Sequence, residues 1–237
     1  MFAARSSEAV RWAVLLEPES GTATKGKTMK LHTFPMSPNS IKVMAVIHQL
    51  GLDVEVNVVD LTKGETMTEE FRALNPNQKI PVLEDEDFIV WESQTIMKYL
   101  AEKHMSSLIP KLFTERITMD MWLNWNLAHF SPAVGGVVWE RVAPSFVEGY
   151  KTDEAALAKS MADLQRYAPI LDAHLSGKEF VVGSAPTLAD VALASSLVHM
   201  EMAQLPMEPY TNLMAWYQRV AALDYFKKAV PAAPSRA

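Results

Sequence analysis

The chain has 237 residues, of which 49% are hydrophobic, and a formal net charge of −6 at pH 7. This length and apolar content suit one large domain or two small ones with a buried core. No basic block is present, and no apolar run reaches the roughly 18 residues that span a bilayer. We therefore expect no nucleic-acid partner and no membrane span.

Cysteine is absent. The chain therefore has no disulfide, no thiolate metal ligand and no cysteine nucleophile, and any thiol used in a reaction must arrive with a ligand. The first tyrosine is Tyr99, so a hydroxyl that acts in the first part of the chain belongs to serine or threonine. No cluster of metal-binding residue types stands out, and we expect no metal site.

Residues 1–29 are predicted to form a flexible N-terminal extension. Their one apolar patch, residues 9–16, is interrupted by Arg11, and residues 20–27 have the composition of a polar linker.

Residues 30–40 predict a short strand, a proline turn and the start of a helix, which Gly51 ends. The free N–H groups and the dipole of a helix N-terminus favour negative charge. A thiolate is one such charge, and Ser37 and Ser40 could donate hydrogen bonds to it. The alternative is structural, because Ser37 followed by Pro38 also matches an ordinary helix N-cap.

Residues 54–60 have the β-branched alternation of a strand, and a strand–helix–strand unit of this length predicts two parallel strands. A short helix follows at 68–74. Residues 78–83 then predict a buried strand that starts near Pro81. In the cis form of the Ile80–Pro81 bond, the N–H and C=O of Ile80 would be free to pair with an extended peptide ligand. The sequence leaves the isomer open.

An acidic turn at 84–87 leads into a returning strand at 88–91, and Ser93 is predicted to be the N-cap of the next helix. Beyond residue 106 the pattern is almost wholly helical. Pro132, the Gly135–Gly136 pair and Pro144 are predicted to bend or break the first long helix. The predicted helices of this half are 113–130, 153–175, 210–220 and 224–230.

Thr187 and Asp190 have the spacing of a capping box, in which each side chain bonds the backbone N–H of the other residue. The run that follows, residues 191–194, is apolar nearly all round. We expect this helix to be the buried centre of the second half.

In combination, Ser37, Ile80–Pro81, Glu92–Ser93 and the Gly-x-x-x-Thr-x-x-Asp pattern of residues 183–190 resemble the cytosolic glutathione S-transferases of the serine type, the theta, phi and delta classes. The resemblance implies an α/β plus all-α fold, with a thioredoxin-like glutathione-binding domain at 30–105 and an all-helical domain at 106–237. It also implies a cytoplasmic homodimer with glutathione as co-substrate.

The same resemblance implies site residues. Ser37 would hydrogen-bond the glutathione thiolate. Ser40 is the alternative, since bacterial glutathione-dependent β-etherases have a serine at this later position beside an asparagine. The resemblance also implies a set of residues that hold glutathione through backbone or side-chain contacts: Lys79, Ile80, Pro81, Glu92 and Ser93.

For the second substrate, a small hydrophobic electrophile, the candidate residues are Met36, Trp125 and His129. Plain packing between helices is the alternative for all three. The expected activity is attack of the glutathione thiolate on such electrophiles. Two alternatives stay open, a glutathione-dependent β-etherase or dehalogenase and a non-catalytic interaction module with the same fold.

Overall fold

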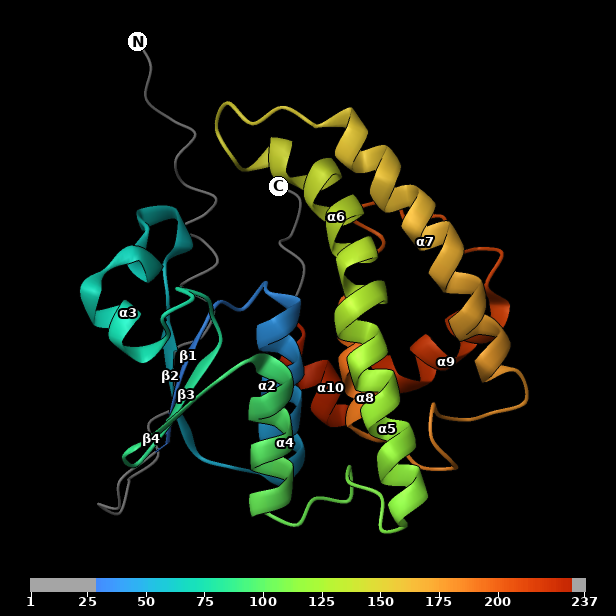
Figure 1. Ribbon diagram of the computed structural model, residues 1–237, viewed down its shortest axis with the longest axis horizontal. Helices are drawn as coiled ribbons and strands as arrows, with labels where there is room; N and C mark the ends of the chain where they lie inside the picture. Colours follow the sequence, from blue (N-terminus) through green and yellow to red (C-terminus); the bar gives the residue numbers. More distant parts are fainter. Residues whose placement is uncertain (1–28, 232–237) are drawn as a thin grey trace.

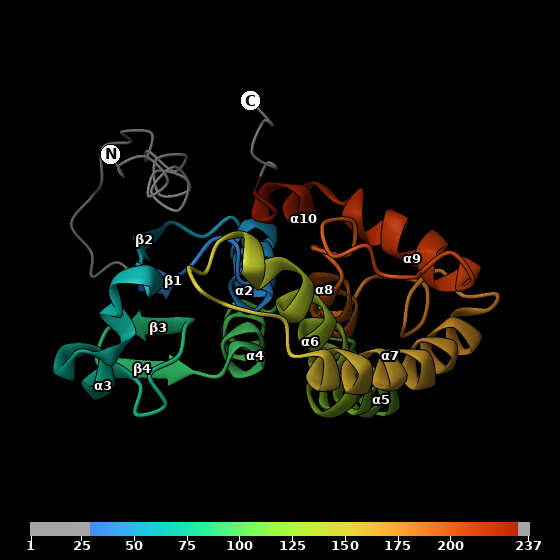
Figure 2. The same cartoon turned by 90° about the horizontal axis from the view of Figure 1, so that it is seen from above.

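The structure is a computed structural model that describes residues 29–231. The predicted N-terminal extension lies outside these residues apart from Met29. Figure 1 shows a sheet with its helices beside a larger group of helices, and Figure 2 shows the same division from above. Among the described helices, none combines the length and the apolar character that a bilayer crossing needs.

The sheet has four strands in the order β2-β1-β3-β4. β1 and β2 are parallel, as the strand–helix–strand pattern predicts, whereas β3 runs antiparallel to both β1 and β4. The strands are β1 (Met29–Thr33), β2 (Val54–Val58), β3 (Val82–Asp85) and β4 (Phe88–Trp91).

Helices cover both faces of this sheet. α2 and α4 pack side by side on one face, and the shorter α3 lies on the other, as both views show. Gly51 ends α2 in the left-handed conformation, with a φ of 64° that glycine adopts without strain. The helices of this half are α2 (Pro38–Leu50), α3 (Glu69–Leu74) and α4 (Ser93–Lys103).

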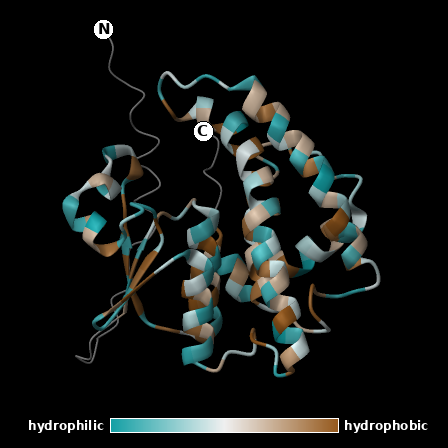
Figure 3. Ribbon diagram, in the orientation of Figure 1, coloured by the Kyte–Doolittle hydropathy of each residue, from teal (hydrophilic) through white to brown (hydrophobic). Residues whose placement is uncertain are grey.

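The second half is helical, as the sequence predicts. Its helices mix polar and apolar residues along their length (Figure 3), so that one side of each can cover the core while the other faces solvent. They are α5 (Phe113–Trp125), α6 (Ser131–Val142), α7 (Glu154–Leu175), α8 (Leu188–Ser196), α9 (Thr211–Ala221) and α10 (Asp224–Ala229).

Of the residues predicted to bend or break the first long helix, Pro132 and Gly135–Gly136 do not end it, whereas α6 ends at Val142, just before Pro144. A π-helical turn, Asn126–Phe130, joins α5 to α6 and lets Pro132, which has no N–H, sit in the first turn of α6. The glycines lie within α6, and Gly136 marks a close approach to α7. A Cβ at Gly136 would lie 2.2 Å from Oγ of Ser160.

α8 is the centre of the helical half, because all of its residues are buried. The predicted capping box at its start is confirmed. The Asp190 carboxylate accepts hydrogen bonds from the Thr187 N–H at 2.8 Å and from the Thr187 hydroxyl at 3.0 Å. It also accepts from the Val181 N–H and from Nε1 of Trp216, each at 2.8 Å, so this helix entrance is tied to two further segments.

Candidate active site

The serine loop, residues 34–37, joins β1 to α2 through a tight turn. The Ser37 N–H donates to the Phe34 carbonyl at 2.9 Å, and the Ser37 carbonyl accepts from the N–H groups of Ser40 and Ile41, each at 2.9 Å. Ser37 has the extended backbone of an N-cap, and Pro38 opens the helix. The loop therefore presents Ser37 at the N-terminus of α2, where the helix dipole favours negative charge.

The two candidate serines have different environments. Ser40 is 0% exposed, and its Oγ accepts a hydrogen bond from the Phe34 N–H at 3.2 Å. Ser37 is half-buried, and within the described residues its hydroxyl makes no hydrogen bond, so the side chain does not cap the helix. Ser40 thus holds the loop together, whereas the hydroxyl of Ser37 is free to donate to a ligand.

A second helix entrance lies beside this loop. Ser93 is the first residue of α4 and Glu92 is its N-cap, so the prediction that Ser93 is the N-cap is wrong by one residue. The Glu92 backbone has a φ of 68°, and its side chain is exposed. The Ser93 hydroxyl donates to Oδ1 of Asn39 at 3.3 Å, which joins the start of α4 to the start of α2. Two helix N-termini therefore favour an anion in the same place.

The Ile80–Pro81 bond is cis. Because β3 pairs antiparallel to β1 with Val82 opposite His32, the segment before β3 lies next to the end of β1, where the serine loop begins. The N–H and C=O of Ile80 have no hydrogen-bond partner among residues 29–231. Lys79 is exposed, and its carbonyl accepts from Nδ2 of Asn75 at 2.7 Å.

Lys42, on α2, is a charged residue of this region that the sequence reasoning missed. Its side chain is only 3% exposed and forms no ion pair with any described residue. Burial lowers the pKa of Lys42 to about 8, although the nearby Glu92 carboxylate opposes the shift. The one signal in the sequence is a lysine inside the otherwise apolar stretch that runs from Ile41 to Ile47.

Two of the three candidate electrophile residues lie together, because the ring centroids of Trp125 and His129 are 6.4 Å apart. Met36 lies in the serine loop and is half-buried. Trp125 stacks on Phe130 with ring centroids 5.6 Å apart, and His129 lies 5.1 Å from the Tyr167 ring of α7. Among the described side chains, neither ring makes a hydrogen bond or ring contact with the serine loop. These contacts agree with the packing alternative for Trp125, whereas His129 is an exposed residue.

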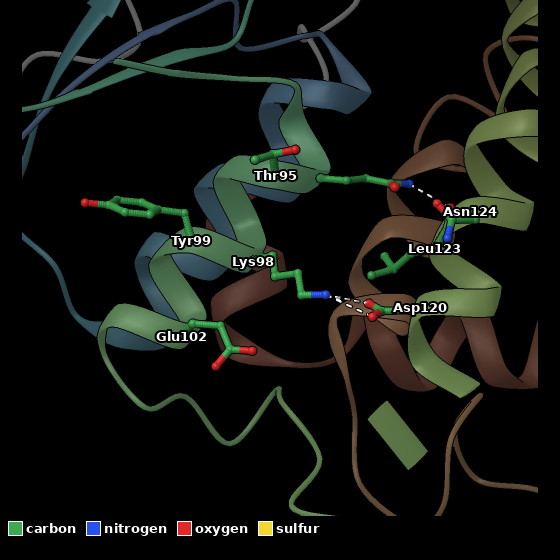
Figure 4. A pocket seen from close by; sticks show the side chains of 8 residues that line it. Thr95, Lys98, Tyr99, Glu102, Asp120, Leu123 and Asn124 are labelled. Carbon is green, nitrogen blue, oxygen red and sulfur yellow. Dashed lines mark hydrogen bonds and ion pairs between the residues drawn. The ribbon is translucent and has the colours of Figure 1, made fainter. Parts of the chain in front are cut away.

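A cavity of about 380 Å³ lies between α4 and α5, away from the serine loop. Figure 4 shows Lys98 reaching across it to Asp120, with Nζ 2.9 Å from the carboxylate. None of the candidate site residues lines this cavity. No group of metal-ligating side chains occurs within the part of the chain that the structure describes.

The sheet of β2-β1-β3-β4 with its three helices is a thioredoxin-like domain, and an all-helical domain follows it. Two family models match the chain in the same order. They are the N-terminal domain of glutathione S-transferase over residues 27–102 and its C-terminal domain over residues 129–224.

Known proteins resemble both halves together. Glutathione S-transferase 3 of Zea mays is 32% identical over 213 residues, which are 87% of this chain and 95% of that protein. A solved delta-class glutathione transferase of Nilaparvata lugens is 29% identical, with a TM-score of 0.74, over 85% of this chain and 92% of that one. A glutathione transferase homolog from Lodderomyces elongisporus, solved with two GSH per subunit, is 25% identical, with a TM-score of 0.76. The match covers 86% of this chain and 98% of that one.

The chain therefore belongs to the glutathione S-transferase family, whose enzymes use glutathione as co-substrate.

Proposed function

We propose that this enzyme is a serine-type glutathione S-transferase in which the Ser37 hydroxyl donates a hydrogen bond to the glutathione thiolate. The observation that carries the proposal is the difference between the two serines. The Ser37 hydroxyl is unpaired within the described chain and lies at a helix N-terminus, whereas Ser40 is buried and bonded to the loop. The similarity to a delta-class transferase supports the same class.

In this proposal the tripeptide lies along the edge formed by three segments. Its cysteinyl backbone pairs with the free N–H and C=O of Ile80, as an added strand would. Its γ-glutamyl amino and carboxylate groups contact Glu92 and Ser93, where the helix N-termini favour the carboxylate. Lys79, which is exposed beside Ile80, contacts the ligand through its ammonium group.

The chemistry follows from the pKa of the thiol. A free thiol has a pKa of about 8.5 and is mostly protonated at pH 7. A hydroxyl donor and a helix N-terminus each stabilise the thiolate by about 1 kcal/mol, and together they lower the thiol pKa by more than one unit. The thiolate then attacks an electrophilic carbon held beside Met36: the carbon–sulfur bond forms and the leaving group, such as the chloride of a chloronitroarene, departs with its bonding electron pair. Ser37 acts as a donor and is not itself a nucleophile.

The test compares Ser37→Ala and Ser40→Ala, with Ser107→Ala as a control on an exposed serine outside the loop. The pKa of the bound thiol is read from thiolate absorbance in the ultraviolet, and turnover from conjugation of a chloronitroarene. We expect Ser37→Ala to raise the thiol pKa by about one unit and to lower kcat about tenfold or more at pH 7. An unchanged thiol pKa in Ser37→Ala would refute the assignment.

The substrates are proposed to be small hydrophobic electrophiles, since the thiolate is generic and Met36, which precedes Ser37 in the loop, is apolar. A β-etherase or dehalogenase would use the same thiolate. Aryl ethers and haloalkanes, assayed beside the chloronitroarene, separate these activities. Glutathione binding with no turnover on any of them would favour the non-catalytic module.

We also infer that the enzyme is a homodimer, as the family resemblance implies, and that it acts in the cytoplasm, where glutathione is kept reduced. Large apolar side chains are exposed every fourth residue along α5, at Phe113, Ile117 and Met121, and on β4 at Phe88 and Trp91. A second copy that covered them would remove this apolar surface from water.

Light scattering after gel filtration tests the dimer. We expect Met121→Glu to shift the protein to monomer, whereas Ile170→Glu, a matched change on an exposed apolar residue of α7, leaves it dimeric. A monomeric wild type would refute the proposal.

A further inference from the structure

The peptide group that joins Met36 to Ser37 is held at both ends. Its carbonyl accepts a hydrogen bond from Nε2 of His199 at 2.7 Å, and its N–H donates to the Phe34 carbonyl at 2.9 Å. Because a peptide group is planar and rigid, two bonds on its opposite sides fix the orientation of the plane. The direction in which the Ser37 side chain leaves the backbone depends on that plane.

The two bonds come from different parts of the molecule. Phe34 belongs to the serine loop itself, whereas His199 follows α8 in the helical half. The contact of His199 with the loop is therefore a link between the two domains, in addition to the packing of α2 against α8. A carbonyl only accepts hydrogen bonds, so Nε2 must carry the proton, and the imidazole donates here whether its ring is neutral or charged.

His199 is itself held in place. Its side chain is half-buried, and its carbonyl accepts from the Ala203 N–H at 3.0 Å. Arg141, at the end of α6, donates to the carbonyls of Ala203 and Gln204 at 2.8 and 2.6 Å. These bonds anchor the segment that carries the imidazole, so the donor is presented to the loop from a fixed support.

We propose that His199 is a positioning residue for thiol activation, which acts by holding the Met36–Ser37 peptide so that the Ser37 hydroxyl faces the sulfur. The proposal rests on the role proposed above for Ser37. The imidazole touches neither substrate in this role. Its effect passes through one backbone group, and a side chain that donates from the same place can replace it.

The first experiment needs no ligand. Amide hydrogen exchange of residues 34–41, followed by mass spectrometry, reports how tightly the loop is held. We expect exchange in this segment to become about three- to tenfold faster in His199→Ala, which corresponds to the loss of one ordinary hydrogen bond. His199→Gln, whose amide nitrogen can donate from nearly the same point, returns the rate toward that of the wild type.

His174→Ala is the matched control. Nε2 of His174 also bonds a backbone carbonyl, that of Val181 at 2.9 Å, but this bond lies wholly within the helical half. This variant tests whether any lost histidine–carbonyl bond loosens the serine loop by lowering overall stability. We expect it to lower the melting temperature without selectively accelerating exchange at residues 34–41.

The second experiment measures the bound glutathione thiol. In His199→Ala we expect its pKa to rise and kcat at pH 7 to fall about three- to tenfold, while KM for glutathione changes little. His199→Gln restores both values.

Two results would overturn the inference while leaving the role of Ser37 intact. One is unchanged loop exchange in His199→Ala, and the other is faster exchange with an unaltered thiol pKa. A wild type that binds glutathione without lowering its thiol pKa would instead refute the proposed function, and the positioning role of His199 with it.

Discussion

The entrances to α2 and α8 begin with the same kind of sequence, a hydroxyl residue followed by a helix. In the structure, side-chain hydrogen bonds cap only one of them, the entrance to α8. At α8 the Asp190 carboxylate accepts four hydrogen bonds, from Val181, Trp216 and both the N–H and the hydroxyl of Thr187. At α2 the Ser37 side chain caps nothing.

The difference lies in what surrounds each helix start. Asp190 is fully buried among groups of its own domain, where an unpaired donor would be costly. Ser37 lies at the boundary of the two halves, half-exposed, so its hydroxyl can remain unpaired at little cost. The first entrance contributes to stability, and the second leaves its polar groups available to a ligand.

The largest predicted effect concerns Asp190→Ala. It leaves buried donors of Val181, Thr187 and Trp216 without an acceptor, at about 1–3 kcal/mol each. We expect the free energy of unfolding in urea to fall by about 3–5 kcal/mol. Asp163→Ala, which removes an exposed ion pair with Lys159, is the control. It should change the free energy of unfolding by less than about 1 kcal/mol. A loss below about 1 kcal/mol for Asp190→Ala would erase the contrast between the two entrances.

The next effect concerns Lys42, the buried lysine of α2. Its pKa in the folded state, about 8, lies below the ordinary value of 10.5, so between these pH values the unfolded chain binds more protons. The free energy of unfolding of the wild type should therefore rise with pH across this window, and the full cost of the buried charge applies below pH 8. Lys42→Met removes that cost, and we expect it to stabilise the protein at pH 7 by up to about 3 kcal/mol.

Urea unfolding of Lys42→Met and the wild type at pH 7 and at pH 10 tests this sign. The difference in free energy of unfolding between Lys42→Met and the wild type should shrink as the pH rises. A difference that grows with pH, or a variant that is less stable at pH 7, would show that the lysine is stabilised in the folded state.

The smallest effect concerns Ser37→Asp, which would complete the cap that Ser37 leaves open. A carboxylate at the N-cap should raise the free energy of unfolding by about 0.5–1 kcal/mol. It also removes the donor and adds a negative charge beside the thiolate, so the pKa of bound glutathione should rise above that of Ser37→Ala. Thermal unfolding and thiolate absorbance measure both effects. If the variant is less stable than Ser37→Ala, α2 does not lack a cap in the way described.

Much of the fold follows from local patterns. The period of apolar residues and the position of Gly51 predict the order of strands and helices through α4, and the Thr187–Asp190 spacing predicts a cap that the structure confirms. These signals are local, since each depends on residues a few positions apart. The course of the chain through Pro132 is not local in this sense, because the π-helical turn before it also contacts α7 and α8.

The candidate site also has some features that the local sequence predicts and others that depend on the folded structure. The sequence indicates the serine loop, the Ile80–Pro81 segment and the start of α4, but it does not separate Ser37 from Ser40. That distinction depends on burial and on one hydrogen bond to Phe34. His199 was missed because its partner, the Met36 carbonyl, is 163 residues away, and Lys42 was missed because its burial depends on the packing around α2. Trp125 and His129 stay candidate electrophile residues, and their ring contacts place them beside Phe130 and Tyr167.

The bond from His199 to the Met36 carbonyl spans 163 residues of the chain. At ribosomal rates of about 5–20 residues per second, the serine loop is made on the order of ten to thirty seconds before its distant support exists. The nascent sheet and its helix entrances can form in that interval, but the loop gains this support only when synthesis is nearly complete. A truncated chain that ends before α8 would therefore hold the Met36–Ser37 peptide through the Phe34 carbonyl alone.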